Sequence, residues 1–287
     1  MKKFLSLLSL LVIGCAMLSA QDADHPTPSH ERAYRPITGS LELHLGSASV
    51  RNTYLAPMLY SGSDYGLAYE RTRRWRNLDW MSLQQLSGQF AMATDPGVHS
   101  DQWAGRLRYR YAALYAIDLY YLALMVGPSA GTDVGFDYNL KMGSSNNPAT
   151  AHLTANLGLQ LMATLPYRLW NRGCLASLQL HAPLLGYALM PEYGASYYET
   201  FSLGHTTALH HFTSLHNQQD FDLRLTTDVP LSRHRGGALR LGVDYHIETL
   251  QINQVTTRFS SFEAVVGWTF QRLPVKFSAK GLSYEVY

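Results

Sequence analysis

The stretch that decides the fold class is residues 153–165, Leu-Thr-Ala-Asn-Leu-Gly-Leu-Gln-Leu-Met-Ala-Thr-Leu. Its odd-numbered positions are all apolar, and the positions between them are mostly polar or small. This two-residue period is that of a β-strand, whose successive side chains point to opposite faces. A tilted strand needs about 9–11 residues to cross a bilayer, whereas strands of globular proteins average about 5–6. The length of this alternation therefore favours a membrane-crossing strand.

The same alternation recurs along the chain, with apolar side chains on one face of each segment and polar or charged ones on the other. The predicted strands cover residues 40–50, 58–72, 80–93, 106–115, 119–128, 153–165, 174–184, 220–229, 239–248 and 259–270. Residues 134–141 and 275–287 would add two more. The sequence thus predicts an all-β fold, an antiparallel up-and-down transmembrane β-barrel of 10–12 strands.

The connections between these segments fall into two groups of different length. Residues 73–78, 167–173 and 231–237 are the short ones, and residues 94–101, 131–150 and 185–215 are the long ones. Barrels of the bacterial outer membrane have short turns on one side and longer loops on the other. We therefore expect the two groups to lie at opposite ends of the barrel.

The composition agrees with a surface that water does not fully cover. Only 15% of the residues are charged, against about 25% in soluble domains, and the chain has 19 Tyr, 10 Phe and 5 Trp. The net charge is +2 without a basic run, so nucleic acid is not an expected partner. The expected partners are outer-membrane lipid and a small-molecule or lipid ligand, and the oligomeric state stays open.

The first residues have the pattern of a secretory signal. Lys2 and Lys3 precede an apolar run over residues 4–13, and small residues lead up to Ala20. Cleavage after Ala20 is favoured, and lipidation of Cys15 within a lipobox-like stretch is the alternative. The predicted organisation is a signal peptide at 1–20, a polar leader at 21–36 and one barrel domain at 37–287, located in the outer membrane.

If the signal is removed after Ala20, Cys174 is the one remaining cysteine. An intramolecular disulfide is then impossible. Because Cys174 begins an apolar strand pattern, we interpret it as a small buried hydrophobe and not as a catalytic thiol.

The polar faces of the predicted strands carry charges of both signs, which would meet inside the barrel. A barrel of about ten strands has an interior that side chains can fill. We therefore interpret these residues as a lumenal salt-bridge network, with a narrow selective passage or a ligand pocket as the alternative. The predicted network comprises Glu70, Arg106, Arg108, Arg110, Asp222, Arg224, Asp228, Arg240, Asp244, His246 and Glu248, and Glu263 shares their face.

Two groups of residues in the long outer connection are candidates for chemistry. Four histidines, His205, His210, His211 and His216, lie within twelve residues, but their spacing matches no zinc motif. An exposed polar loop is the favoured interpretation, and no metal or other cofactor is predicted.

The second group is Ser214 and His216, which are two residues apart and would share a strand face, with Asn217 and Asp220 nearby. Outer-membrane lipid hydrolases have a His-x-Ser pair, so the order here is reversed, and the chain has no Gly-x-Ser-x-Gly elbow. A barrel-embedded lipid-modifying hydrolase is therefore an alternative, and a role without catalysis is favoured.

Four stretches resemble a known group of proteins. They are 135–139 (Gly-Phe-Asp-Tyr-Asn), 146–149 (Asn-Asn-Pro-Ala), 191–201 (Pro-Glu-Tyr-Gly-Ala-Ser-Tyr-Tyr-Glu-Thr-Phe) and the signal end at 18–21 (Leu-Ser-Ala-Gln). The chain resembles uncharacterised outer-membrane β-barrel proteins, carried as domains of unknown function, of gut-type Gram-negative anaerobes. The resemblance implies the location and assigns no catalytic residue. The first hypothesis is a binding, transport or envelope-structural role, followed by the hydrolase and by a soluble periplasmic β-protein.

Overall fold

A computed structural model describes residues 37–75, 79–119, 122–140, 148–169, 172–191, 202–203, 209–231, 237–252 and 254–272. Nearly all of this part of the chain is β-strand. The strands are β1 (Ile37–Asn52), β2 (Ala56–Arg74), β3 (Trp80–Thr94), β4 (Asp101–Leu119), β5 (Leu122–Asn139), β6 (Ala149–Leu169), β7 (Arg172–Leu189), β8 (His210–Ser214), β9 (Gln218–Pro230), β10 (Gly237–Ile252) and β11 (Val255–Arg272). Within the described ranges, no helix is long and apolar enough to span a membrane.

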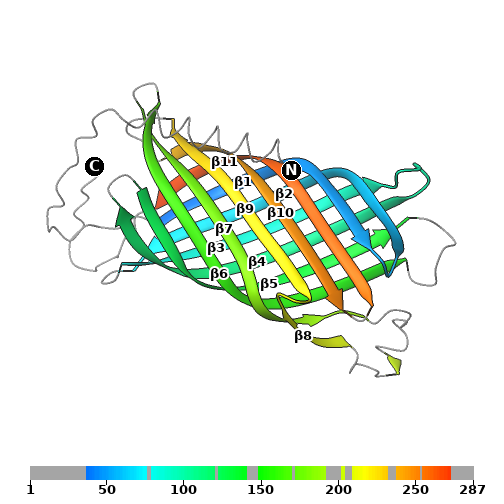
Figure 1. Cartoon of the computed structure of the whole chain (residues 1–287). Coiled ribbons are helices and arrows are strands. Elements are labelled where there is room, and N and C mark those ends of the chain that lie inside the picture. Colours follow the sequence, from blue (N-terminus) through cyan, green and yellow to red (C-terminus); the bar gives the residue numbers. More distant parts are fainter. Residues whose placement is uncertain are drawn as a thin grey trace, which may run out of the picture.

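The strands close into a barrel (Figure 1). From β1 to β7, and then through β9, β10 and β11, each strand pairs antiparallel with the next. The seam between β11 and β1 runs without a break from Ile37↔Arg272 to Asn52↔Thr257. The predicted antiparallel up-and-down barrel of 10–12 strands is confirmed, with ten strands around the ring.

The short strand β8 shares a strand position with β9, the eighth of the ten around the ring, and is not an eleventh strand of the barrel. Both β8 and β9 run antiparallel to β7, with Ser214 opposite Leu185 and Asp222 opposite His181. Between these two pairs the residue numbers of β8 and β9 run from 214 to 222, whereas those of β7 run only from 185 to 181. The excess forms the turn at 215–217, where Asn217 Oδ1 accepts a hydrogen bond from Ser214 N at 2.8 Å.

The predicted strand positions are correct, but the strands are longer than predicted. Nine of the ten predicted segments lie within single strands, and the segment 119–128 starts at the last residue of β4 and otherwise belongs to β5. The structure contradicts a separate strand at 134–141, because residues 134–139 belong to β5. The predicted strand at 275–287, like the signal peptide and the leader at 1–36, lies outside the described residues.

Glycines explain why residues 131–139 extend β5 although they resemble a loop. A Cβ atom on Gly135 would lie 2.2 Å from the His152 ring, and one on Gly131 would lie 3.0 Å from the Asn156 side chain. Both glycines face partners on β6. They therefore make room for large polar side chains of the neighbouring strand inside the barrel.

The two ends of the barrel differ in their connections, as predicted. The end that carries Ile37 and Arg272, called the turn end below, has the connections 75–79, 120–121, 170–171 and 231–236. The opposite end, the loop end, has 95–100, 140–148 and 190–209, together with very short connections at 53–55 and 253–254. The predicted placement of the two groups of connections at opposite ends is confirmed, but 231–236 and 95–100 are equally long, and the loop end also has two very short connections.

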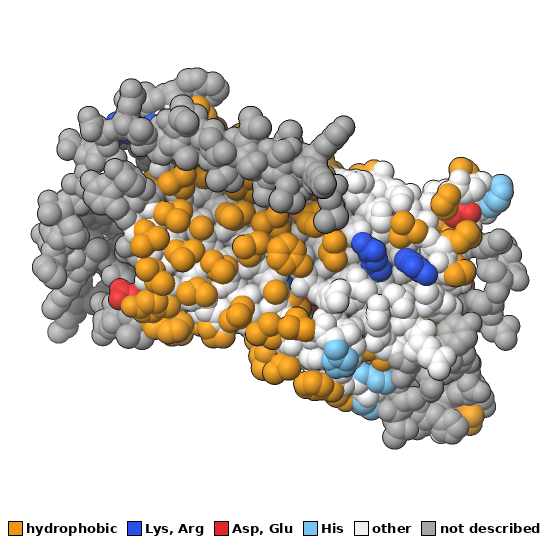
Figure 2. Space-filling view, viewed as in Figure 1, with side chains coloured by type: hydrophobic (Ala, Val, Ile, Leu, Met, Phe, Trp, Pro, Cys, Tyr) orange, Lys and Arg blue, Asp and Glu red, His pale blue; other side chains and the backbone are white. Residues whose placement is uncertain are grey.

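An apolar band surrounds the half of the barrel nearer the turn end. On β1 the outward residues Leu41, Leu43 and Leu45 are 59%, 45% and 45% exposed, and polar outward residues follow from Ser47 to Arg51. Figure 2 shows this division, with hydrophobic side chains gathered on one half of the visible surface and polar ones on the other. Each strand thus continues beyond the apolar band, which explains why the strands exceed the length needed to cross a bilayer.

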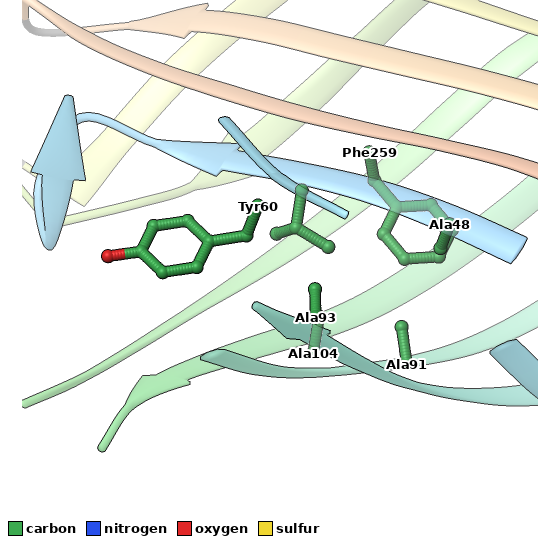
Figure 3. Packing of buried hydrophobic residues seen from close by; sticks show 7 residues of the cluster. Ala48, Tyr60, Ala91, Ala93, Ala104 and Phe259 are labelled. Carbon is green, nitrogen blue, oxygen red and sulfur yellow. The ribbon is translucent and has the colours of Figure 1, made fainter. Parts of the chain in front are cut away.

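The interior has small apolar clusters near both ends and polar side chains between them. At the loop end, Tyr60 and Phe259 pack with Val50 and small alanines (Figure 3). Leu250 and Ile252 form a second loop-end cluster with Val255. Near the turn end the cluster consists of Met81, Leu83, Ala112, Leu114, Met125 and Met162. The polar middle of the lumen is therefore bounded by apolar packing.

The apolar band predicts where a charge will be tolerated on the outer wall. Leu67 and Ser63 are both exposed on the outward face of β2. Leu67 lies within the apolar band and Ser63 lies beyond it. We expect Leu67→Arg to lower the free energy of unfolding by about 2–4 kcal/mol, because the guanidinium would lie in hydrocarbon. The matched control Ser63→Arg should change it by less than about 0.5 kcal/mol. Denaturant unfolding in lipid vesicles measures both, and equal losses would contradict the assignment of the band.

Candidate functional site

The inward face of the barrel buries an unusual number of ionisable side chains, and acids outnumber bases. The five arginines are Arg106, Arg108, Arg110, Arg224 and Arg240, and the four histidines are His44, His152, His181 and His246. The eleven acids are Glu42, Asp64, Glu70, Asp133, Asp137, Asp220, Asp222, Asp228, Asp244, Glu248 and Glu263. Strand alternation places them all on one side of the wall. This lumenal charge network is the candidate functional site.

Arg240 on β10 joins three acids near the turn end. Its Nη1 donates to Glu42 Oε1 at 2.8 Å and to Glu70 Oε1 at 2.9 Å. Its Nε and Nη2 donate to the two carboxylate oxygens of Asp228 at 2.8 and 2.9 Å. The bidentate geometry on Asp228 is the strongest arrangement of an arginine on a carboxylate.

A second layer spans the lumen. Arg224 on β9 donates to Asp244 Oδ2 from Nε at 3.0 Å and from Nη2 at 2.9 Å, and its Nη1 lies 3.3 Å from Glu42 Oε2. Gln85 on β3 donates to Gln179 on β7 at 2.8 Å. Because β3 and β7 are separated by three strands on one side of the ring and five on the other, this bond crosses the interior.

A third layer connects β4 with β9 and β10. Asp222 accepts hydrogen bonds from Arg110 and, at 3.4 Å, from Arg108. His246 Nδ1 lies 2.7 Å from the same carboxylate and 3.6 Å from Asp220. Asp222 is therefore shared by three cationic or potentially cationic groups.

The layer nearest the loop end is centred on Arg106. It donates to Asp137 at 3.0 Å and to Glu248 at 3.4 Å, and its guanidinium carbon lies 4.8 Å from the centre of the Phe259 ring. His152 Nε2 lies 3.4 Å from Glu248. The apolar cluster of the loop end and the charge network therefore meet at Arg106 and Phe259.

The loop at 95–100 closes onto this end of the lumen. Burial opposes ionisation of the Asp95 carboxyl, but the His99 and Ser100 amides donate to it at 2.6 and 3.0 Å and lower its pKa. Ser100 Oγ in turn donates to Asn139 Oδ1 at 3.0 Å, and Asn139 Nδ2 donates to Tyr60 at 3.2 Å. The loop is thereby fixed to side chains inside the barrel.

Two small cavities of about 20 Å³ each lie between these layers, in the middle of the lumen. Both are lined by Gln85, Arg110, Asp222, Arg224 and Asp244. A water molecule needs at least about 10–15 Å³ of such volume. Each cavity therefore has room for about one water and not for an organic solute.

A larger hollow lies on the outer wall. It has a volume of about 560 Å³, and small residues such as Gly88 and Gly105 form part of its lining. The large side chains around it are Leu43, Leu45, Tyr65, Leu67, Phe90, Leu107, Val134 and Phe136. This hollow is apolar and belongs to the apolar band of the outer wall.

All residues of the predicted lumenal network lie in the lumen, and the structure adds members that the prediction left out. Glu42 and His44 follow the alternation of β1, which was the available signal. Asp133 and Asp137 lie in the glycine-containing stretch that had the composition of a loop. Glutamines such as Gln85 and Gln179 carry no charge pattern, so only the closed barrel shows that they bridge the lumen.

The structure brings Ser214 and His216 together at the loop end, in the turn between β8 and β9. Ser214 Oγ and His216 Nδ1 are 2.5 Å apart. The residues expected to orient the histidine have other partners. Asn217 hydrogen-bonds the backbone of Ser214 and Phe212, and Asp220 faces His246 in the lumen. Within the described residues, the pair thus has the contact of a nucleophile and a base without the third group of a triad.

The loop histidines do not converge within the described part of the chain. His210 hydrogen-bonds Tyr187, and its neighbour His211 points to the opposite face of β8. His216 contacts Ser214, and His205 lies outside the described residues. The groups that could hold a metal ion lie in the lumen instead, and they comprise His44, Asp244 and Glu263 in one case and Asp220, Asp222 and His246 in the other.

The comparison with known families covers most of the chain. The family model described as "Protein of unknown function (DUF3316)" matches residues 4–276. The chain belongs to this family. Cys174 is buried and free in this DUF3316 protein, and this burial agrees with its interpretation as a small hydrophobe. No curated protein matches the chain.

Several solved outer-membrane barrels are similar to this DUF3316 protein. The β domain of the Bordetella autotransporter BrkA is 13% identical, with a TM-score of 0.43 over 82% of this chain and 99% of that one. The translocator domain of the autotransporter NalP from Neisseria meningitidis is 7% identical, with a TM-score of 0.40 over 94% and 97%. The outer membrane protease OmpT from Escherichia coli is 6% identical, with a TM-score of 0.41 over 86% and 99%.

The contacts of Arg240 give a stability prediction. Arg240→Ala would leave the buried carboxylates of Glu42, Glu70 and Asp228 without their shared partner. We expect the free energy of unfolding to fall by about 3–5 kcal/mol, because an uncompensated buried charge remains. The control is Arg51→Ala, which removes an exposed arginine from the outer face of β1. Guanidinium unfolding in detergent measures both variants, and a loss for Arg240→Ala no larger than for Arg51→Ala would refute the pairing.

Proposed function

We propose that this DUF3316 protein spans the outer membrane of a Gram-negative envelope as a closed barrel and acts at its wall and loop end. The observation that carries this proposal is the layered network of charges and amides that crosses the lumen and leaves cavities of about 20 Å³. A barrel filled in this way does not serve as a diffusion pore. Its role is therefore binding or structural, with the long connections of the loop end as the presented surface.

The distribution of polarity supports the membrane location over a soluble periplasmic protein. Large apolar side chains such as Leu41 and Leu67 face outward, while Glu42 and Glu70 are buried. A soluble β-sandwich has the opposite arrangement, with its apolar faces packed together inside. The cleaved signal peptide predicted at 1–20 would bring the chain to this compartment.

Outer-membrane lipid is the proposed partner of the apolar band. The outer hollow near Gly88 and Gly105 adds a recess of about 560 Å³ whose lining is almost entirely apolar. Acyl chains match this surface because they require neither hydrogen bonds nor charges from the wall.

A second candidate function is lipid hydrolysis at the loop end, and the contact between Ser214 and His216 favours it. The serine hydroxyl would be the nucleophile, and the imidazole would take its proton. Both residues lie on the loop-end side of the barrel, where strand β8 pairs with the last residues of β7.

The closed lumen can be tested by conductance in planar bilayers. We expect the wild-type barrel to give no steady current, because each layer blocks the passage of hydrated ions. The double variant Arg110→Ala/Arg224→Ala removes two side chains that line both small cavities and should produce discrete channel openings. Arg51→Ala, on the outer face, should remain closed. A steady open current through the wild-type protein would overturn the proposal.

The hydrolase candidate can be tested with one substitution. If Ser214 is the nucleophile, Ser214→Ala should reduce the hydrolysis of phospholipid by the reconstituted barrel by at least about 10³-fold. Thr213→Ala changes a neighbouring hydroxyl that faces the other way and should leave the rate unchanged. The candidate fails if the wild type releases no fatty acid, or if Ser214→Ala releases it at the same rate.

A further inference from the structure

The strand register brings four ionisable side chains together beside the barrel seam. Asp64 on β2 and Glu263 on β11 both lie opposite Gly46 of β1, and Asp244 on β10 lies opposite Glu263. Because Gly46 has no side chain, no side chain of β1 stands between Asp64 and Glu263 at this position. His44, two residues before Gly46, faces the same way.

The distances within this group are short. His44 Nδ1 lies 2.7 Å from Glu263 Oε2 and 3.8 Å from Asp244 Oδ2. One ligand atom from each of these three residues falls within 4.8 Å of the others. A single metal ion bound at about 2.0–2.2 Å from each ligand could replace the direct contacts with small side-chain movements.

Several oxygens of the group have no hydrogen-bond partner. Both carboxylate oxygens of Asp64 and Oδ1 of Asp244 are buried without one, and Asp64 is 0% exposed. Buried polar atoms are almost always paired, so an unpaired carboxylate next to another carboxylate needs a cation or a shared proton.

The surrounding side chains support the ligands in the manner of a metal site. His44 Nε2 lies 3.4 Å from Glu42 Oε2, which would hold the imidazole proton on Nε2 and leave Nδ1 free to bind. Gln89 donates to Glu263 Oε1, and Arg224 donates to Asp244 Oδ2. A carboxylate behind a ligating histidine is the usual support of such a ligand.

We propose that His44, Asp244 and Glu263 bind one divalent first-row transition-metal ion, such as Zn²⁺ or Mn²⁺, inside the lumen, with Asp64 as the acid beside Glu263. One imidazole with two carboxylates suits these ions, whereas Ca²⁺ and Mg²⁺ prefer oxygen ligands alone. The second group, Asp220, Asp222 and His246, is less suited, because two arginines, Arg108 and Arg110, contact Asp222. Asp244 is contacted by Arg224 at Oδ2 and keeps Oδ1 without a partner.

The test uses the full barrel purified in detergent, with its metal content measured by mass spectrometry. After removal of metal by a chelator, Zn²⁺, Mn²⁺ and Mg²⁺ are titrated separately by calorimetry. We expect one Zn²⁺ or Mn²⁺ per chain and far weaker binding of Mg²⁺. Asp64→Asn should weaken the binding of Zn²⁺ by at least about tenfold, while Asp133→Asn, another buried lumenal acid hydrogen-bonded to Thr154 and Asn156, should bind as the wild type does.

Folding and metal binding are read separately. The shift in gel mobility on boiling reports whether each variant forms the closed barrel, and visible absorption of Co²⁺ in the wild type reports inner ligands without any substitution. A folded wild type that binds no metal, or a folded Asp64→Asn that binds it equally well, would overturn the proposal and assign a shared proton to Asp64 and Glu263. Neither result would bear on the proposal that the lumen is closed, because conductance measures that property independently.

Discussion

The constraint on which the rest of this structure depends is that every backbone amide in hydrocarbon must be paired within the protein. An unpaired group there costs several kcal/mol, so a β-sheet can cross a membrane only as a closed ring. The unbroken register between β1 and β11 meets this requirement, because it pairs the first strand of the chain with the last. Once the ring closes at ten strands, its interior is narrow enough for side chains from opposite walls to meet.

That meeting of opposite walls explains the composition of the inward face. Charges on a narrow lumen lose water when the barrel forms, and their mutual attraction offsets this cost only where the geometry is good. Arg240 and Arg224 satisfy the condition by contacting Glu42 together, from two strands that lie apart from β1. The arginines therefore link distant strands through salt bridges inside the lumen. The apolar clusters at Phe259 and Met81 exclude solvent from these charged layers.

Much of this could be predicted from the sequence, because strand alternation is a local property. The pattern of residues 153–165 gives the strand, its faces and its length, and the same pattern elsewhere gives the strand count. Asp133 and Asp137 escaped prediction because Gly131 and Gly135 make their strand resemble a loop, although those glycines accommodate Asn156 and His152. The partners across the lumen, such as Gln85 and Gln179, depend on where the ring closes, which no local pattern encodes.

The location of the proposed metal site relates the local strand pattern to the closure of the ring. His44 lies on β1 and Glu263 on β11, so their contact crosses the seam between strands from opposite ends of the chain. Contacts of such large sequence separation carry the highest loop-closure cost in folding. An ion held by β1, β11 and β10 would stabilise the seam where that cost is greatest, and its charge would offset the neighbouring carboxylates of Asp64 and Glu263. Closure of the ring and neutralisation of its interior would then rest on the same three side chains, His44, Asp244 and Glu263.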